Sequence, residues 1–188
     1  MATSLTRKYW HGLLEASLWE VMNEKYTMKK WILFVATILL LCSSVARADD
    51  FDDAIDVYQK GNYVQAIELF RLLAEQGNAG AQDNLGVMYR NGEGVTQDYQ
   101  EALKWYRLAA EQGYATAQNN LGVMYVMGKG VTQDYVRARM WFNLAARKGD
   151  EDAKENRFRI AKKMTLSQIS EAQKMARDCK RKNFKNCE

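Results

Sequence analysis

The sequence predicts an all-α fold: an α/α solenoid, a right-handed superhelix of helix-turn-helix repeats with a C-terminal capping helix pair. Residues 78–113 and 114–149 align without a gap at a period of 36 residues, and 22 of these positions are identical. Within each copy, apolar residues recur at spacings of three and four, which is the pattern of one buried helix face. Such units bury a shared core only when they stack, so the period predicts a solenoid.

Each full repeat is predicted to contain two helices. In the second repeat, Ala81, Leu85 and Met88 lie on one face of the first helix. Tyr99 and Tyr106 lie on one face of the second helix at the same kind of spacing. The third repeat carries the same pattern 36 residues later, so the two repeats are expected to fold alike.

The predicted helix ends carry boundary residues. Asp98 precedes a second helix and Glu101 follows three residues later, a capping-box pattern that satisfies free amide groups at a helix start. The chain contains no Pro, so Gly must mark the helix ends. Because Gly adopts the left-handed conformation without strain, one Gly is expected to close the second helix of each repeat. These residues are Gly77, Gly113 and Gly149.

Two more glycines, Gly86 and Gly122, fall in the middle of predicted helices. Gly at such a position costs roughly 1 kcal/mol relative to Ala. Because both repeats carry this cost at the same position, we expect another helix to approach closely there.

Shorter segments flank the two full repeats. Residues 49–77 form a short first repeat, in which Gly61 and Asn62 replace the longer loop. Residues 150–188 are predicted to form a C-terminal helical cap, with one helix over 151–163 and a second that runs to about residue 181. Thr165, with Gln168 three residues later, is expected to cap the second of these helices.

Residues 28–48 have the layout of a secretory signal peptide: a basic start, an apolar run of 11 residues, and a small-residue triplet that ends at Ala48. The run is shorter than the roughly 20 apolar residues that span a bilayer. We therefore expect cleavage after Ala48 and a periplasmic or secreted product. Residues 1–27 are interpreted as an upstream extension from a start codon placed too early. A cytoplasmic tail on a signal anchor is the alternative.

The expected product, residues 49–188, contains no His, because His11 is the only one in the chain. This excludes Ser-His and Cys-His nucleophile pairs and His-ligated metal sites, so we expect no catalytic residue, cofactor or metal. Cys179 and Cys187 remain as an even pair in an exported chain, which indicates one disulfide. A free redox pair is the alternative, although the spacing is not C-x-x-C.

Charge is divided unevenly along the expected product. Residues 49–136 carry 13 acidic and 6 basic groups, net −7, whereas residues 137–188 carry 15 basic and 7 acidic groups, net +8. The formal charge of the whole chain, +4, is too small to predict nucleic-acid binding. The basic C-terminal part leaves open an envelope-associated protein with a weak, salt-sensitive peripheral contact. Apart from that contact and the transient signal peptide, no membrane association is expected.

The full repeats share the string A-Q-x-N-L-G-V-M-Y-x-x-G-x-G-V-T-Q-D-Y over residues 81–99 and again over 117–135. A-x-x-W and L-A-A-x-x-G follow in both copies. This pattern resembles the Sel-like ("sel-one-like") repeat family, relatives of the tetratricopeptide repeat, and the end of the chain resembles exported bacterial members. Thr96 and Thr132 depart from it, since the family often has Pro there. The resemblance implies an adaptor or scaffold, in an envelope or host-interaction role, whose partner is another protein or peptide. We expect a monomer.

By analogy with tetratricopeptide grooves, the resemblance places the partner in a concave groove that the first helix of each unit lines. An ordinary solvated helix face is the alternative interpretation of the same residues. The predicted groove residues are Asp52, Asp56 and Gln59 in the first unit, Asp83, Val87, Arg90 and Asn91 in the second, and Asn119, Val123, Val126 and Met127 in the third.

An enzyme is the competing function, because some disulfide-rich relatives of the family have been linked to β-lactam binding or hydrolysis. Penicillin-recognising enzymes need the sequence S-x-x-K. Ser167 and Ser170 are the only serines in residues 49–188, and neither has Lys three residues later. With no nucleophile–base pair in the sequence, we do not expect an enzyme.

Overall fold

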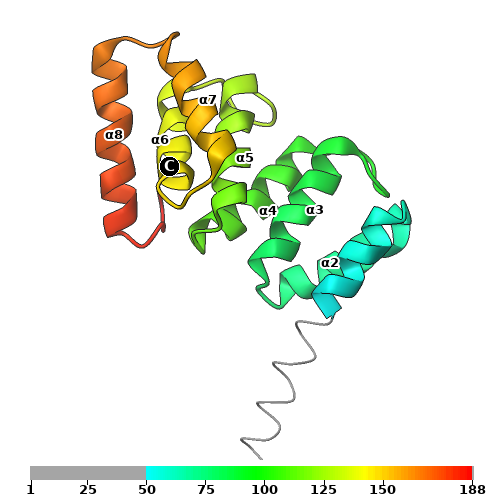
Figure 1. Ribbon diagram of the computed structural model, residues 1–188. Helices are drawn as coiled ribbons and strands as arrows, with labels where there is room; N and C mark the ends of the chain where they lie inside the picture. Colours follow the sequence, from blue (N-terminus) through cyan, green and yellow to red (C-terminus); the bar gives the residue numbers. More distant parts are fainter. Residues whose placement is uncertain (1–49, 188) are drawn as a thin grey trace, which may run out of the picture. The chain divides into compact units, whose positions relative to one another are not determined.

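The computed structural model describes residues 50–187. The predicted extension 1–27, the signal peptide 28–48 and its cleavage site after Ala48 lie outside the described residues. Within the described range, every regular element is a helix, so the predicted all-α fold is confirmed (Figure 1). None of the helices in this range is both long enough and apolar enough to cross a membrane.

The helices follow the repeat pattern in pairs. The short first repeat contains a helix over residues 50–59 and α2 (Tyr63–Glu75). The second repeat contains α3 (Ala79–Asn91) and α4 (Tyr99–Glu111), and the third contains α5 (Ala115–Met127) and α6 (Tyr135–Ala146). The C-terminal cap contains α7 (Glu151–Ala161) and α8 (Leu166–Arg181). The first cap helix therefore ends two residues before the predicted end at residue 163.

Packing between neighbours confirms the α/α solenoid. From α2 to α6, each helix packs against the next one along the chain. The cap departs from this order, because α7 and α8 both pack against α6 and make few contacts with each other. Figure 1 shows α6 between them. The cap is therefore built on α6, and it leaves a space between α7 and α8.

The two mid-helix glycines mark the closest approaches between paired helices, as predicted. A Cβ atom on Gly86 would lie 2.5 Å from the ring of Tyr106 in α4. A Cβ on Gly122 would overlap the ring of Phe142 in α6 in the same way. Both rings are fully buried. Each repeat thus seats an aromatic ring of its second helix directly on the backbone of its first helix.

The residues predicted to cap helix ends behave as expected with one exception. The Asp98 carboxylate accepts hydrogen bonds from the amides of Gln100 and Glu101, at 2.8 and 3.1 Å. The reciprocal half of the predicted capping box is wrong, because the Glu101 carboxylate pairs with Lys104 Nζ at 3.0 Å instead. The capping box of Thr165 and Gln168 forms in full. The glycines that close the repeats have positive φ angles, as expected: Gly77, Gly113 and Gly149.

The predicted disulfide joins Cys179, which is buried in α8, to Cys187 beyond the helix, with the two Cα atoms 5.0 Å apart. The loop that it closes packs the Phe184 ring against the Lys148 Nζ atom, 4.9 Å from the ring centroid. Lys148 Nζ also donates a hydrogen bond to the carbonyl of Gly113. The disulfide therefore fastens the end of the chain to the third repeat.

Replacing Cys187 with Ser is expected to lower the free energy of unfolding by about 2–3 kcal/mol, because the closed loop is short. Urea titration followed by circular dichroism measures the change. Ser in place of Thr116, an exposed position on α5, is the control and should leave stability nearly unchanged. An unchanged midpoint for the Cys187 variant would show that the bond does not hold the cap.

Candidate functional site

The first helices of successive units are linked by hydrogen bonds between polar side chains. Asn120 Nδ2 in α5 donates to Asp83 Oδ1 in α3 at 2.9 Å. One repeat later, Asn156 Nδ2 in α7 donates to Asn119 Oδ1 in α5 at 3.0 Å. Both pairs are 37 residues apart in sequence. The bonds therefore place α3, α5 and α7 side by side as one face of the solenoid.

A second set of bonds ties each first helix to the repeat before it. Gln82 Nε2 donates to the carbonyl of Ala74 at 3.0 Å, and Gln118 Nε2 donates to the carbonyl of Ala110 at 3.1 Å. Both glutamine side chains are buried. Buried polar groups strongly favour the geometry that satisfies them, so these bonds fix the spacing between repeats.

Two of the predicted groove residues are buried because their side chains form the hydrogen bonds between successive first helices. Asp83 and Asn119 are 6% and 8% exposed, and their side-chain oxygens accept the bonds from Asn120 and Asn156. Burial raises the pKa of Asp83 to about 6, and the bond from Asn120 and the charge of Arg90 only partly oppose this rise. These two positions hold the repeats together at the base of the face.

Three other predicted residues line a pocket of about 240 Å³ between α5 and α7. Val123 and Val126 are half-buried, and Met127 is 58% exposed. The ring of Phe142 contributes to the lining from α6. The pocket therefore offers an apolar surface at the centre of the face that the first helices share.

The opposite wall of the pocket comes from α7 and from Lys163 just beyond its end, none of which is among the predicted groove residues. Its lining residues are Asn156, Arg159, Ile160 and Lys163. Asn156 and Ile160 lie 36 residues after Asn120 and Met124, so the repeat register continues into α7. Extending the 36-residue alignment beyond position 149 would have found them. Because Arg159 and Lys163 lie beside the apolar residues, this wall is basic.

The remaining predicted residues lie outside the pocket. Val87 is half-buried on α3. At the end of the same helix, Arg90 Nε donates to Asn91 Oδ1 at 3.2 Å, and Arg90 Nη1 lies 3.5 Å from Asn120 Oδ1. The first-unit residues are exposed on the helix over 50–59, where Asp56 pairs with Lys60 at 2.5 Å. These first-unit residues are Asp52, Asp56 and Gln59.

Comparison with known families identifies three units in the chain. The Sel1 repeat matches residues 79–114 and 115–150, each one residue later than the predicted boundaries. A tetratricopeptide repeat matches residues 51–75, in the short first repeat. A comparison with curated proteins gives no significant match.

Solved structures that are similar to this chain include two repeat proteins. One is a protective antigen present in uropathogenic Escherichia coli strains that displays an SLR fold, with 33% identity and a TM-score of 0.69. The other is a Sel1 repeat protein from Oxalobacter formigenes, with 36% identity and a TM-score of 0.54. The matches cover 75% and 57% of this chain. The chain spans only 31% and 43% of those two proteins, so it corresponds to part of each.

Proposed function

This chain belongs to the Sel1 repeat family, and on that basis we propose that it is an exported adaptor that holds a segment of another protein. Sel1 and tetratricopeptide repeats generally mediate protein–protein interaction, and members of the family are typically scaffolds without catalysis. The proposed binding surface is the α5–α7 groove, defined as the pocket lined by Val123, Val126 and Met127 of α5 and by the facing residues of α7.

The observation that carries this proposal is the chemistry of the α5–α7 groove. Apolar side chains of α5 lie beside the basic Arg159 of α7 and Lys163 just beyond the end of α7. Arg159 already pairs with Glu155 at 2.5 Å, whereas Lys163 Nζ faces the ring of Tyr135, 5.9 Å from its centroid. This combination suits a peptide that presents an apolar side chain next to an acidic group.

The groove is also held open before a partner arrives. The bond between Asn119 and Asn156 fixes α5 against α7 in the floor of the face. A preformed groove avoids the cost of ordering side chains and backbone during binding, so a short segment suffices for useful affinity.

Export is part of the proposal. It is supported by the basic, apolar and small-residue order of residues 28–48 and by a disulfide, which persists in oxidising compartments. N-terminal sequencing of protein from the producing cell should find Asp49 as the first residue. A product that still begins upstream of residue 28 would favour a signal anchor.

The groove is tested by affinity capture with three matched baits: the wild type, Met127→Glu and Leu108→Glu. Both positions are exposed, at 58% and 41%, so neither charge enters the core. A true partner should be captured by the wild type and by the Leu108 variant. Its capture by the Met127 variant should fall at least about tenfold, as for a central interface residue. Equal loss with both variants would reject the α5–α7 groove as the binding surface.

A further inference from the structure

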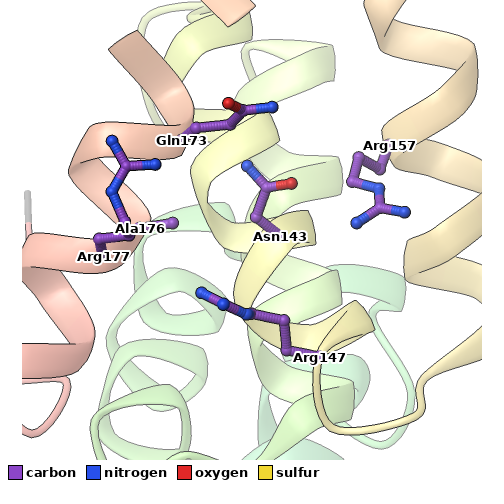
Figure 2. Close-up of a pocket in the computed structure, with 6 residues that line it drawn as sticks. All are labelled: Asn143, Arg147, Arg157, Gln173, Ala176 and Arg177. Atoms are coloured by element: carbon purple, nitrogen blue, oxygen red, sulfur yellow. The ribbon is translucent and has the colours of Figure 1, made fainter. Parts of the chain in front are cut away.

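The space between the two cap helices forms a second pocket, distinct from the α5–α7 groove. Its volume is about 270 Å³, and it is lined by residues of α6, α7 and α8. Figure 2 shows Asn143 of α6 at its centre, with Gln173 and Arg177 of α8 on one side and Arg157 of α7 on the other. The cap pocket, defined by these residues with Arg147 and Ala176, contains no acidic side chain.

Three arginine side chains line this pocket: Arg147 at the C-terminal end of α6, Arg157 of α7 and Arg177 of α8. Among residues 50–187, Arg147, Arg157 and Arg177 form no ion pair with an acidic side chain. In contrast, Arg159 on α7 and Arg181 on α8 each pair with a carboxylate at 2.5 Å. Like charges that line one pocket without acidic partners repel one another, and a bound anion would relieve that repulsion.

A fourth arginine adds to the positive charge behind the pocket. Arg139 is 9% exposed, and its Nη1 atom donates to the backbone carbonyl of Arg157 at 2.6 Å. Its Nε atom is buried and has no hydrogen-bond partner in the described part of the chain. Burial, and then the nearby charge of Arg157, lower the pKa of Arg139.

A neutral donor also faces the pocket without a partner. Asn143 is 8% exposed, and its Nδ2 group makes no hydrogen bond to any described residue. A buried amide without a partner costs free energy, on the order of 1–3 kcal/mol, so a water, an ion or a ligand that accepts its hydrogen bond would be favoured there. The neighbouring Gln173 supplies a second amide.

We propose that the cap pocket binds a phosphate monoester or inorganic phosphate, with Arg147, Arg157 and Arg177 as its charged ligands and Asn143 as a neutral donor. A phosphate dianion offers several acceptor oxygens, which donors from three helices can share, whereas a single carboxylate would leave two guanidinium groups unneutralised. Arg147 and Arg177 also line an adjoining pocket with Lys174 and Lys180, in which the one acidic side chain, Asp178, is paired with Arg181. The surface beside the site is therefore mainly basic, which would favour larger phosphorylated molecules.

The proposal is tested by calorimetric titration of the purified protein with inorganic phosphate at low ionic strength. One saturable site per chain is expected. Arg157→Gln and Arg177→Gln should each weaken binding by about tenfold or more, because each removes a charged hydrogen-bond donor. The matched control is Arg137→Gln, on α6 like Asn143 but paired with Asp134 at 2.7 Å. Thermal melts check folding, and Arg177 is exposed, so its variant is expected to fold.

Two further binding experiments identify the kind of molecule that carries the phosphate group. Vesicles of phosphatidylcholine with phosphatidic acid, set against phosphatidylcholine alone, test a lipid phosphomonoester, and glycerol phosphate tests a soluble one. Binding in any of these experiments supports the cap pocket as the site if Arg157→Gln abolishes that binding. The proposal is overturned by the absence of saturable phosphate binding, by equal weakening in the Arg137 control, or by acetate that binds as tightly as phosphate.

Discussion

Alanine at position 122 is expected to destabilise the protein by about 1–3 kcal/mol, although Ala is the better helix former. The new Cβ would overlap the Phe142 ring, which is fully buried and has no free space to enter. Overpacking therefore outweighs the gain in helix propensity of about 1 kcal/mol. Urea titration followed by circular dichroism measures the loss.

The effect of Gly122→Ala on stability is expected to change sign when the Phe142 ring is removed. Phe142→Ala alone should cost about 3–5 kcal/mol, since it leaves a cavity where a buried ring was. In that background, Gly122→Ala should become neutral or stabilising, because the overlap is gone and the helix propensity remains. If Ala at position 122 were equally destabilising in both backgrounds, the ring would not be the reason for the glycine.

Asn in place of Asp83 is expected to stabilise the protein at neutral pH, by up to about 3 kcal/mol. The Asp83 carboxyl has its ordinary pKa near 4 in the unfolded chain, and burial raises its folded pKa to about 6. Between these values the folded state holds more protons than the unfolded state, so stability falls as pH rises from about 4 to 6. Asn carries no charge at any pH and keeps the bond from Asn120.

At the equivalent position of the third repeat, the acceptor is already an amide. Asn119 accepts a hydrogen bond from Asn156 there, as Asp83 accepts one from Asn120. The stability difference between wild type and Asp83→Asn should therefore be small below about pH 4 and should grow as pH rises through 6. Denaturant titrations at several pH values measure it. Glu171→Gln, at an exposed position on α8, is the control and should show no such trend. A difference independent of pH would contradict the buried carboxylate.

The sequence was sufficient to predict the features that depend on local pattern. The 36-residue period predicted the helix pairs, Gly149 marked the end of the third repeat, and the repeated Gly86 and Gly122 indicated close packing before any ring could be assigned to it. The cysteine count indicated the disulfide. Each of these follows from the order and count of residues in the sequence, without knowledge of which side chains of neighbouring repeats touch.

Features that depend on neighbouring repeats were harder to predict. Asp83 is polar and its helical position suggests an open face, yet the link to Asn120 on the next repeat buries it. The repeat pattern fades after position 149, so Asn156 on α7 was not counted as part of the same face. The cap pocket could not be predicted, because it depends on α8 packing against α6.

The central claim is that a partner contacts the face made by the first helices, in the α5–α7 groove. Site-specific photocrosslinking in the producing cells tests it most directly, with benzoylphenylalanine at Met127 in one strain and at Leu108 of α4 in another. One discrete protein adduct is expected from Met127 and none from Leu108. The same adduct from both positions, or an adduct from Leu108 alone, would contradict it.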